Sequence, residues 1–189
     1  MKRIRRLLYP KRPNSGWTPL VGSLVLVVTA AAALVAWQPA GRAGSSPYLK
    51  WLNEDVVYII GDEERAAYEN LKTNEEREKF IEQFWQRRDP APGTPENEAK
   101  QEHYRRIAYA NKRFPTSARE GWQTDRGHMY IVYGPPDEIE SHPGGGGVIR
   151  FPHEVWKYRH VEGIGNNLFF TFIDRMRTGD FRLAPGSAR

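Results

Sequence analysis

Charged and apolar positions are sharply separated at the start of the chain. Residues 1–16 contain six basic side chains and no acidic one, and the run from Leu20 to Trp37 contains no charge. As a helix at about 1.5 Å per residue, this run spans about 27 Å, close to the roughly 30 Å of a bilayer core. The pattern therefore predicts a basic tail over residues 1–16 and a transmembrane helix over residues 17–37.

The flanking charges also predict how this segment is oriented. Lys and Arg before an apolar span favour a cytoplasmic N-terminus, so the rest of the chain is expected outside the inner membrane. Residues 20–37 would then hold the protein in the membrane. A cleaved signal peptide is the alternative, because Gly41–Ala43 is a small-x-small sequence, and cleavage there would leave a periplasmic or secreted protein. Residues 38–47, rich in Gly, Pro and Ser, are predicted to be a flexible tether.

Helical patterns dominate the first half of the globular domain, which we assign to residues 48–189. The apolar stretch 56–60 is too short for periodicity to distinguish an extended segment from the end of a helix. Asp62 follows it and is a suitable N-cap, so a helix is predicted from there to about Leu71.

Two further helices are predicted from capping residues and apolar stripes. Thr73 and Glu76 form a capping box. A stripe typical of a core-facing helix follows, made of Phe80, Ile81, Phe84 and Trp85. Thr94, with Pro95 at the first helical position, predicts the start of a third helix that runs to about Arg113.

Strand patterns replace helical ones in the second half. Residues 128–133 are predicted to form a strand covered on both faces, because apolar side chains occupy both alternations. Residues 155–159 alternate polar with aromatic side chains, which predicts a half-buried strand. Residues 168–173 are the most apolar and are predicted as a central strand, with 180–183 as an edge. This order indicates an α+β fold, with N-terminal helices packed on a C-terminal antiparallel sheet.

The distribution of charge along the chain argues against nucleic acid as a partner. The formal net charge is +5, of which residues 1–16 contribute +6, so the remaining residues carry −1. A domain without a basic excess lacks the electrostatic footprint of a nucleic-acid-binding protein, and no nucleic acid is expected as a partner. The chain has no cysteine, which excludes disulfides, thiolate catalysis and zinc–thiolate sites.

One short stretch carries the strongest signal in the sequence. Residues 121–125 read Gly-Trp-Gln-Thr-Asp, and further matching stretches occur at 84–85, 88–90, 97–98, 106–111, 133–137 and 156–165. With these stretches in this order, the chain resembles the GWxTD domain family of bacterial exported or envelope-associated proteins. The resemblance covers about residues 48–183. It implies an exported domain and transfers no catalytic residue.

The GWxTD stretch is predicted to form a turn that is locked against the helices. Gly121 and Gly127 would allow the positive φ angles that sharp turns need. Trp122 would bury its ring near Phe84 and Trp85, with one partner for its indole N–H.

The polar side chains of this stretch are expected to bond locally. Asp125 can accept hydrogen bonds from nearby backbone N–H groups, and it is expected to pair with Arg87, Arg88 or Arg126. The same surface, at the mouth of the sheet, can instead bind a partner. The candidate structural or binding residues are Gly121, Trp122, Thr124, Asp125, Arg126, Gly127, Tyr133, Gly134, Arg88 and Asp89.

An exported hydrolase is the alternative function. Asp125 or Asp89, together with His128, could supply a general base and the group that orients it. The chain contains no G-x-S-x-G, H-E-x-x-H or P-loop pattern to support a particular reaction.

Neither a metal nor a cofactor is expected. His142, His153 and His160 flank the glycine run 144–147 but lack the close spacing of metal ligands. The glycine run lacks the Lys and Ser or Thr of a phosphate loop. The sequence therefore favours a membrane-anchored envelope protein whose domain binds a protein or another envelope component without catalysis.

Overall fold

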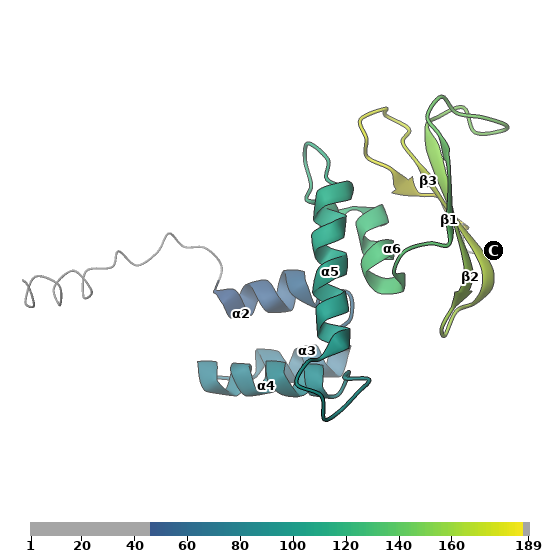
Figure 1. Ribbon diagram of the computed structural model, residues 1–189. Coiled ribbons are helices and arrows are strands. Elements are labelled where there is room, and N and C mark those ends of the chain that lie inside the picture. The colour runs from purple at the N-terminus through teal and green to yellow at the C-terminus, as the bar shows by residue number, and fades with distance from the viewer. Residues whose placement is uncertain (1–45, 187–189) are drawn as a thin grey trace, which may run out of the picture. The chain divides into compact units, whose positions relative to one another are not determined.

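Residues 46–186 are described by the computed structural model shown in Figure 1. The predicted basic tail, the predicted membrane segment at residues 17–37 and nearly all of the predicted tether lie outside this range. Among residues 46–186, no helix is long and apolar enough to cross a membrane. The orientation of the N-terminal segment therefore stays a prediction.

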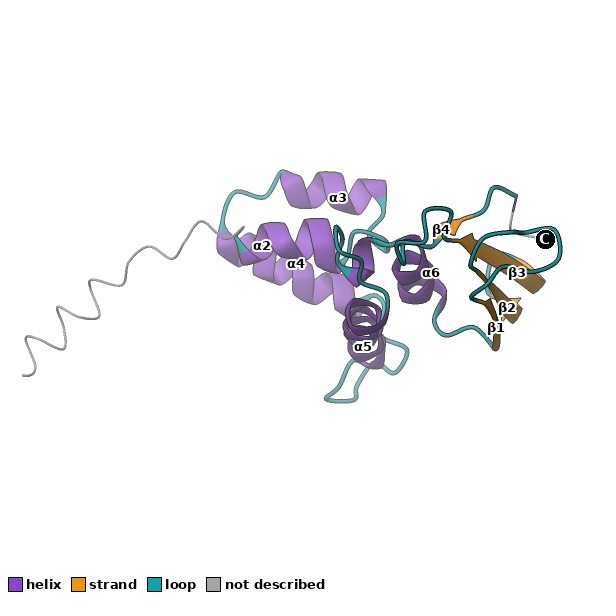
Figure 2. Cartoon of the chain, turned by 90° about the horizontal axis from the view of Figure 1, so that it is seen from above, coloured by secondary structure: helices purple, strands orange, loops and turns teal. Residues whose placement is uncertain are grey.

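Within this range the chain is an α+β domain in which the helices precede the strands (Figures 1 and 2). The helical elements are α2 (Pro47–Lys50), the π-helix η1 (Trp51–Asp55), α3 (Asp62–Glu69), α4 (Asn74–Gln86), α5 (Glu98–Arg113), the 3-10 helix η2 (Gly121–Gln123) and α6 (Asp125–Tyr133). The strands are β1 (Glu138–His142), β2 (His153–Val161), β3 (Gly165–Ile173) and β4 (Arg182–Leu183). They form an antiparallel sheet in the order β1-β2-β3-β4, which confirms the predicted fold class.

The N-cap residues of α3 and α4 set where these helices begin. The Thr73 hydroxyl accepts a hydrogen bond from Glu76 N at 3.2 Å, and the Glu76 carboxylate accepts one from Thr73 N at 3.0 Å. This reciprocal pair confirms the predicted capping box of α4. Helix α3 begins at Asp62, one residue earlier than predicted, because Gly61 and not Asp62 is its N-cap.

The start of α5 also differs from the prediction. Thr94, the expected cap, donates its hydroxyl to two carbonyls of its own loop at 3.1 and 2.8 Å, so it closes a turn ahead of the helix. Asn97 is the actual cap, because its side-chain oxygen accepts a hydrogen bond from Lys100 N at 2.8 Å. Residues 56–60, which the sequence left open, form a turn in which two N–H groups bond the Val56 carbonyl.

Buried apolar side chains form two clusters. The first, called the helical cluster, consists of Trp51, Leu52, Val56, Tyr68, Phe84 and Trp85. The second, called the sheet cluster, consists of Ala110, Phe114, Met129, Tyr130, Ile131, Trp156, Tyr158, Val161, Leu168, Phe170 and Phe172. Of the predicted N-terminal helices, only α5 contributes to the sheet cluster, because the earlier helices bury their apolar faces against one another. Helix α6, which was not predicted, also packs on the sheet.

The long strand β2 alternates as predicted. Trp156 and Tyr158 are buried on the face that carries the sheet cluster. Lys157 lies between them on the opposite face, where it pairs with Glu138 and Glu140 of β1. In both views α6 lies between α5 and the sheet (Figures 1 and 2).

The prediction of a strand over residues 128–133 is wrong, because these residues continue α6. The Thr124 hydroxyl caps this helix by accepting a hydrogen bond from Gly127 N at 3.1 Å, and Gly134, with φ 80°, ends it. Residues 129–131 are all buried, because the helix is covered by α5 on one side and the sheet on another. Covered helices and covered strands have the same short apolar run, so periodicity alone does not separate them.

Candidate functional site

Residues 121–125, here called the motif, form the joint between α5 and α6. Gly121–Gln123 make one turn of 3-10 helix, and Thr124 then caps α6. The Thr124 hydroxyl donates to the Gly121 carbonyl at 2.7 Å while it accepts from Gly127 N at 3.1 Å. Thr124 is 2% exposed, so both bonds lie inside the fold.

Both glycines of this joint are required by close backbone approach, and the expectation of positive φ is wrong. Neither is among the described glycines with positive φ. A Cβ on Gly121 would lie 1.9 Å from the Ala110 carbonyl oxygen, and a Cβ on Gly127 would lie 1.8 Å from the Gly121 carbonyl oxygen. The motif is therefore pressed directly against the backbone of α5, and α6 is pressed against the motif.

Trp122 packs on the sheet cluster. The prediction that it lies near Phe84 and Trp85 is wrong, because those two residues belong to the helical cluster. The reason is that the motif follows the C-terminal end of α5, which belongs to the sheet cluster. The Trp122 backbone N–H donates to the Asn111 side chain at 2.9 Å, and its carbonyl accepts from the Tyr58 hydroxyl at 3.0 Å. Its indole N–H donates to a neighbouring carboxylate at 3.0 Å. Trp122 thus ties the turn after η1 to the end of α5.

Asp125 holds the C-terminal segment against α6. Its carboxylate accepts a hydrogen bond from the Leu183 backbone N–H at 2.8 Å. The same group lies 3.4 Å from the Arg182 guanidinium and 4.0 Å from that of Arg119. The motif aspartate is therefore a link between α6 and β4.

Two of the arginines predicted to pair with Asp125 contact a different acid. Arg87 and Arg88 lie just after α4, and both bind Glu64 of α3, at 2.9 and 2.7 Å. The hydrogen bond from Arg88, with a further one from Arg87, lowers the pKa of Glu64 to about 2 although partial burial opposes this shift. The prediction failed because these arginines lie beside the helical cluster, with Arg88 over the Phe84 ring, whereas Asp125 contacts β4.

Arg126, the third predicted partner of Asp125, reaches the sheet. Its guanidinium donates to Glu154 of β2 at 3.0 Å and to the Gly179 carbonyl at 3.3 Å. The guanidinium carbon lies 4.1 Å from the centre of the Phe181 ring, a cation–π contact. Successive side chains of α6 thus engage different parts of the C-terminal half, Asp125 binding β4 and Arg126 binding β2.

Tyr133 and Gly134 complete the end of α6. The Gly134 carbonyl accepts a hydrogen bond from the buried Tyr158 hydroxyl at 3.0 Å, and a Cβ on Gly134 would meet the Arg106 guanidinium at 2.9 Å. Tyr133 stacks on Phe170 of β3, with the ring planes 8° apart. Both residues therefore position the helix end on the sheet.

The three groups of the alternative hydrolase site have separate contacts in the described residues. The His128 ring stacks on Tyr58 with centroids 4.0 Å apart, and desolvation there lowers its pKa more than the nearby Asp125 carboxylate raises it. The Asp125 carboxylate is hydrogen-bonded to the β4 backbone. Asp89 lies in the turn after α4, where it accepts a hydrogen bond from Ala91 N at 3.0 Å.

A family model matches almost the whole of this described domain. The model is that of the GWxTD domain, and it covers residues 46–183. The chain belongs to the GWxTD domain family. No curated protein and no solved structure matches it.

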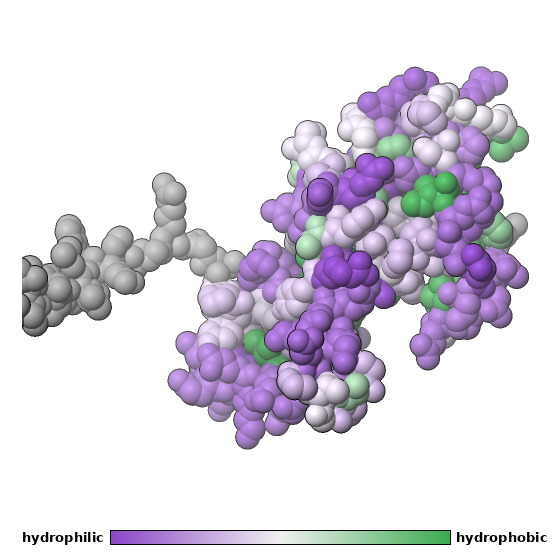
Figure 3. All heavy atoms as spheres, viewed as in Figure 1, coloured by the Kyte–Doolittle hydropathy of each residue, from purple (hydrophilic) through white to green (hydrophobic). Residues whose placement is uncertain are grey.

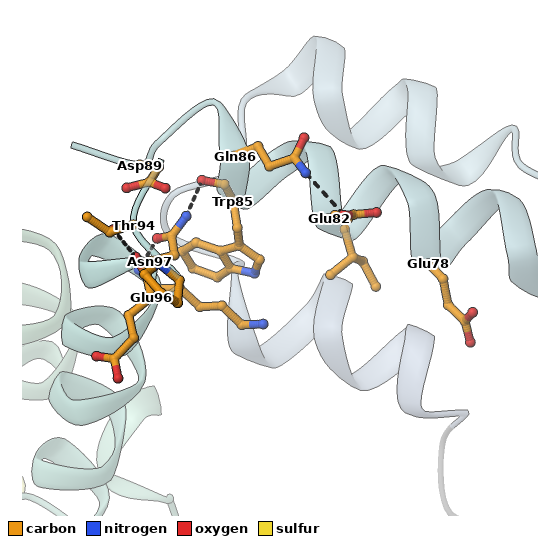
Figure 4. Close-up of a pocket in the computed structure, with 11 residues that line it drawn as sticks. Glu78, Glu82, Trp85, Gln86, Asp89, Thr94, Glu96 and Asn97 are labelled. Atoms are coloured by element: carbon orange, nitrogen blue, oxygen red, sulfur yellow. Dashed lines mark hydrogen bonds between the residues drawn. The ribbon is translucent and has the colours of Figure 1, made fainter. Parts of the chain in front are cut away.

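A groove of about 480 Å³ lies between α4 and the start of α5 in the GWxTD domain (Figure 4). Its lining includes the acids Glu78, Glu82, Asp89 and Glu96. Trp85 also lines it, and the indole N–H of this residue is buried without a partner. The Asn97 side chain crosses the end of the groove to the Trp85 carbonyl, at 2.7 Å. Asp89 is the one predicted candidate residue in this lining.

The histidines near the glycine run do not converge. His142 and His153 stack with ring centroids 4.4 Å apart where β1 meets β2, but His160 lies toward the other end of β2, with its Nδ1 2.7 Å from Asn166. Among the described residues, no group of three or more His, Asp or Glu side chains is arranged to hold a metal ion.

Several residues that complete the GWxTD joint were missed by the sequence reasoning. Tyr58 is 64 positions from Trp122, and the Leu183 N–H is 58 positions from Asp125. No local pattern marks partners at such separations. Arg119 could have been found, because it lies six positions before Asp125 and is the nearest basic residue on that side.

Proposed function

We propose that this GWxTD protein is held in the inner membrane by residues 20–37 and exposes a non-catalytic docking domain outside it. Its partner would be a protein or another component of the envelope. The uncharged run that follows six basic residues supports this address. If the segment were cleaved as a signal peptide, the same domain would be periplasmic or secreted.

The observation that carries the docking role is that the polar groups of the motif are used by the fold itself. Trp122 and Asp125 bond other parts of the domain, at 2.9 and 2.8 Å, and the Thr124 hydroxyl closes the motif on the Gly121 carbonyl at 2.7 Å. Groups held in this way stabilise the joint between helices and sheet. Because these polar groups are already hydrogen-bonded within the fold, they favour a domain that binds a partner through its exposed surface over one that catalyses a reaction with the motif.

The exposed surface offers side chains that suit recognition. The face shown in Figure 3 is largely hydrophilic, with hydrophobic residues set singly among polar ones. Tyr109 is 41% exposed and Ile139 is 48% exposed, and both line one groove beside the sheet. Exposed aromatic and aliphatic side chains beside a groove are typical anchors of protein interfaces.

An exported hydrolase that uses Asp125, His128 and Asp89 is the second candidate, and the contacts of these residues favour it less. A catalytic pair requires the acid to face the histidine, whereas Asp125 faces β4 and His128 faces Tyr58. A screen of hydrolase substrates separates the two functions. Turnover that disappears in Asp125→Asn while the melting temperature is unchanged would favour the hydrolase.

The proposed address is tested by single cysteines, because the natural chain has none. One variant carries Ser15→Cys in the predicted tail, and the other carries Gly144→Cys at the exposed glycine run. In intact spheroplasts a membrane-impermeant maleimide should label Gly144→Cys and should label Ser15→Cys only after lysis. Labelling of both positions only after lysis would place the domain in the cytoplasm and contradict the proposal.

The docking role is tested by chemical crosslinking in native membranes. A discrete heavier species that contains a second protein is expected with the wild-type chain. It should persist in Asp125→Ala, since that carboxylate contacts β4. Loss of the species in a variant that melts normally would move the binding surface to the motif, and no crosslinked species in the wild type would contradict the docking role.

A further inference from the structure

Strand β1 has an unpaired edge in the described sheet. It pairs with β2 from Glu138↔Lys157 to His142↔His153, and it stands at one end of the strand order. An unpaired edge presents alternate backbone N–H and C=O groups that can pair with an added strand. The strand at the opposite end, β4, has two residues and offers a much shorter ladder.

A groove of about 410 Å³ runs beside this edge, bounded by α5 and α6 on one side and by β1 on the other. Its helical wall is aromatic, with Tyr109 and Tyr130 stacked at a centroid distance of 4.4 Å and Phe114 beside them. Ile139 supplies the wall from β1. It lies opposite the buried Trp156 in register, so its side chain is on the helix-facing side of the sheet, yet it remains 48% exposed.

Two charged side chains line the groove, and only the basic one, Arg113, has no ion-pair partner among the described residues. Glu154 lines it but is paired with Arg126 at 3.0 Å and also accepts the Trp156 indole N–H at 3.0 Å. Arg113 lines the groove from the last residue of α5, is exposed, and has no acidic partner among the described residues. A free guanidinium beside an aromatic wall is complementary to a carboxylate next to an apolar side chain.

We propose that an extended segment of a protein partner adds to the free edge of β1, with an apolar side chain against Tyr109 and an acidic one against Arg113. This inference rests on the proposed docking function and names its surface and the class of partner. Backbone pairing supplies affinity, and the groove supplies selectivity. Tyr109 and Arg113 are four positions apart and share one face of α5. The two side chains of the partner that contact them would be two positions apart, because alternate residues of a strand share one face.

A second copy of this chain fits the edge less well. In an antiparallel two-fold pair, the helix-facing side chains of the other β1 would be Ile139 and Ser141, and neither carries a charge for Arg113. The opposite face would bring together Glu138 and Glu140 of both copies, which is unfavourable. A partner with an acidic residue in its strand avoids both problems.

The test selects random peptides of about eight residues, displayed on phage, on the full-length chain in lipid nanodiscs. Enriched sequences should share an apolar residue and an Asp or Glu two positions apart. A synthetic copy of an enriched peptide should bind Ile139→Lys about tenfold more weakly, because an inward-pointing lysine on an edge strand opposes pairing. A copy that is N-methylated on alternate amides should weaken by a similar factor.

A charge exchange tests the contact with Arg113. Arg113→Glu should weaken binding about tenfold, and a peptide whose acid is replaced by lysine should recover it. Lys112→Glu is the matched control, because Lys112 is the exposed neighbour on α5 and does not line the groove. Its effect should stay below about twofold.

Three results would overturn the assignment of β1. They are the absence of any enriched peptide, peptides that bind Ile139→Lys and Arg113→Glu as well as the wild type, and a dimer of this chain that Ile139→Lys abolishes. A native crosslinked partner that persists in both variants would reject the β1 edge while leaving the docking function in place. The absence of any crosslinked partner of the wild-type chain would reject the docking function itself.

Discussion

Gly121 and Gly127 lie where stretches of backbone meet without room for a side chain. The distances of 1.9 and 1.8 Å that a Cβ would have to the nearest carbonyl oxygens are far below any real contact. The neighbouring Thr124 hydroxyl bridges the same two glycines, donating to one carbonyl and accepting from the other N–H. At the level of single residues, the motif is therefore defined by steric fit and by buried hydrogen bonds.

Gly121→Ala should destabilise the domain strongly, because the new methyl group meets backbone of α5 that cannot rotate away. The expected loss is about 3 kcal/mol or more in the free energy of unfolding, measured by denaturant titration of the full-length chain in detergent. Gly144→Ala is the matched control, since a Cβ there has nothing within 4 Å. Equal stability of the two variants would contradict the steric role of Gly121.

Among the elements, α4 and β2 could be predicted from their neighbouring residues, whereas α6 was predicted as a strand. The capping box of α4 and the alternation of β2 are written in neighbouring residues, and both are confirmed. The run 129–133 is apolar or aromatic at successive positions because α6 is covered on two sides, which is also the pattern of a buried strand. Thr124 and Gly134 are local signals for the start and the end of a helix, but the apolar run between them predicted a strand.

The sequence predicted which residues form the candidate site but not which residues they bond. Trp122, Thr124 and Asp125 do lie together at one joint. Trp122 bonds Asn111 and Tyr58, and Asp125 bonds the backbone N–H of Leu183 in β4, which no sequence pattern marks as a partner. The predicted ion pairs of Asp125 were wrong, because charge alone does not show which of several arginines the fold brings near this carboxylate.

Asp125→Ala should loosen β4 without unfolding the domain. The Leu183 amide loses its acceptor, so its hydrogen exchange should become about fivefold faster, equivalent to about 1 kcal/mol for one charge-assisted bond. Asp180→Ala is the control, because it removes a partner of Arg119 and leaves the Leu183 bond intact. Unchanged exchange at Leu183 in Asp125→Ala would contradict the link between α6 and β4.

The contact between α3 and the end of α4 should depend on pH. The pKa of Glu64 is lowered to about 2 in the folded state, chiefly by Arg88, from an unfolded value of 4.5. A lowered carboxyl pKa contributes stability that is present above pH 4.5 and is lost as pH falls toward 2. Because the pair is partly exposed to solvent, this contribution is about 1–2 kcal/mol.

Glu64→Gln therefore should be less stable than the wild type at pH 7, with the difference shrinking as pH falls toward 2. Urea unfolding at pH 7, 5 and 3 measures it. Glu63→Gln is the matched control, because Glu63 is exposed and is the neighbour of Glu64 on α3. A difference between wild type and Glu64→Gln that does not change with pH would contradict the role of the ion pair.

For the whole described domain, the arrangement of two clusters explains why the motif lies where it does. Helix α5 contributes Tyr104 to the helical cluster and Ala110 to the sheet cluster, so it connects the two. The motif fixes the end of this connecting helix to α6, and α6 fixes it to β2 and β4 through Arg126 and Asp125. The groove beside β1 lies next to this joint, so the motif would keep its helical wall in place.

The docking account is tested by photo-crosslinking from the groove in intact cells. Full-length chain carrying p-benzoylphenylalanine in place of Tyr109, which lines the groove, is compared with chain carrying it at Val148, which is 99% exposed outside the groove. We predict one discrete adduct with another protein from position 109, none from position 148, and loss of the adduct in Arg113→Glu. No adduct from position 109, or the same adducts from both positions, would contradict the account.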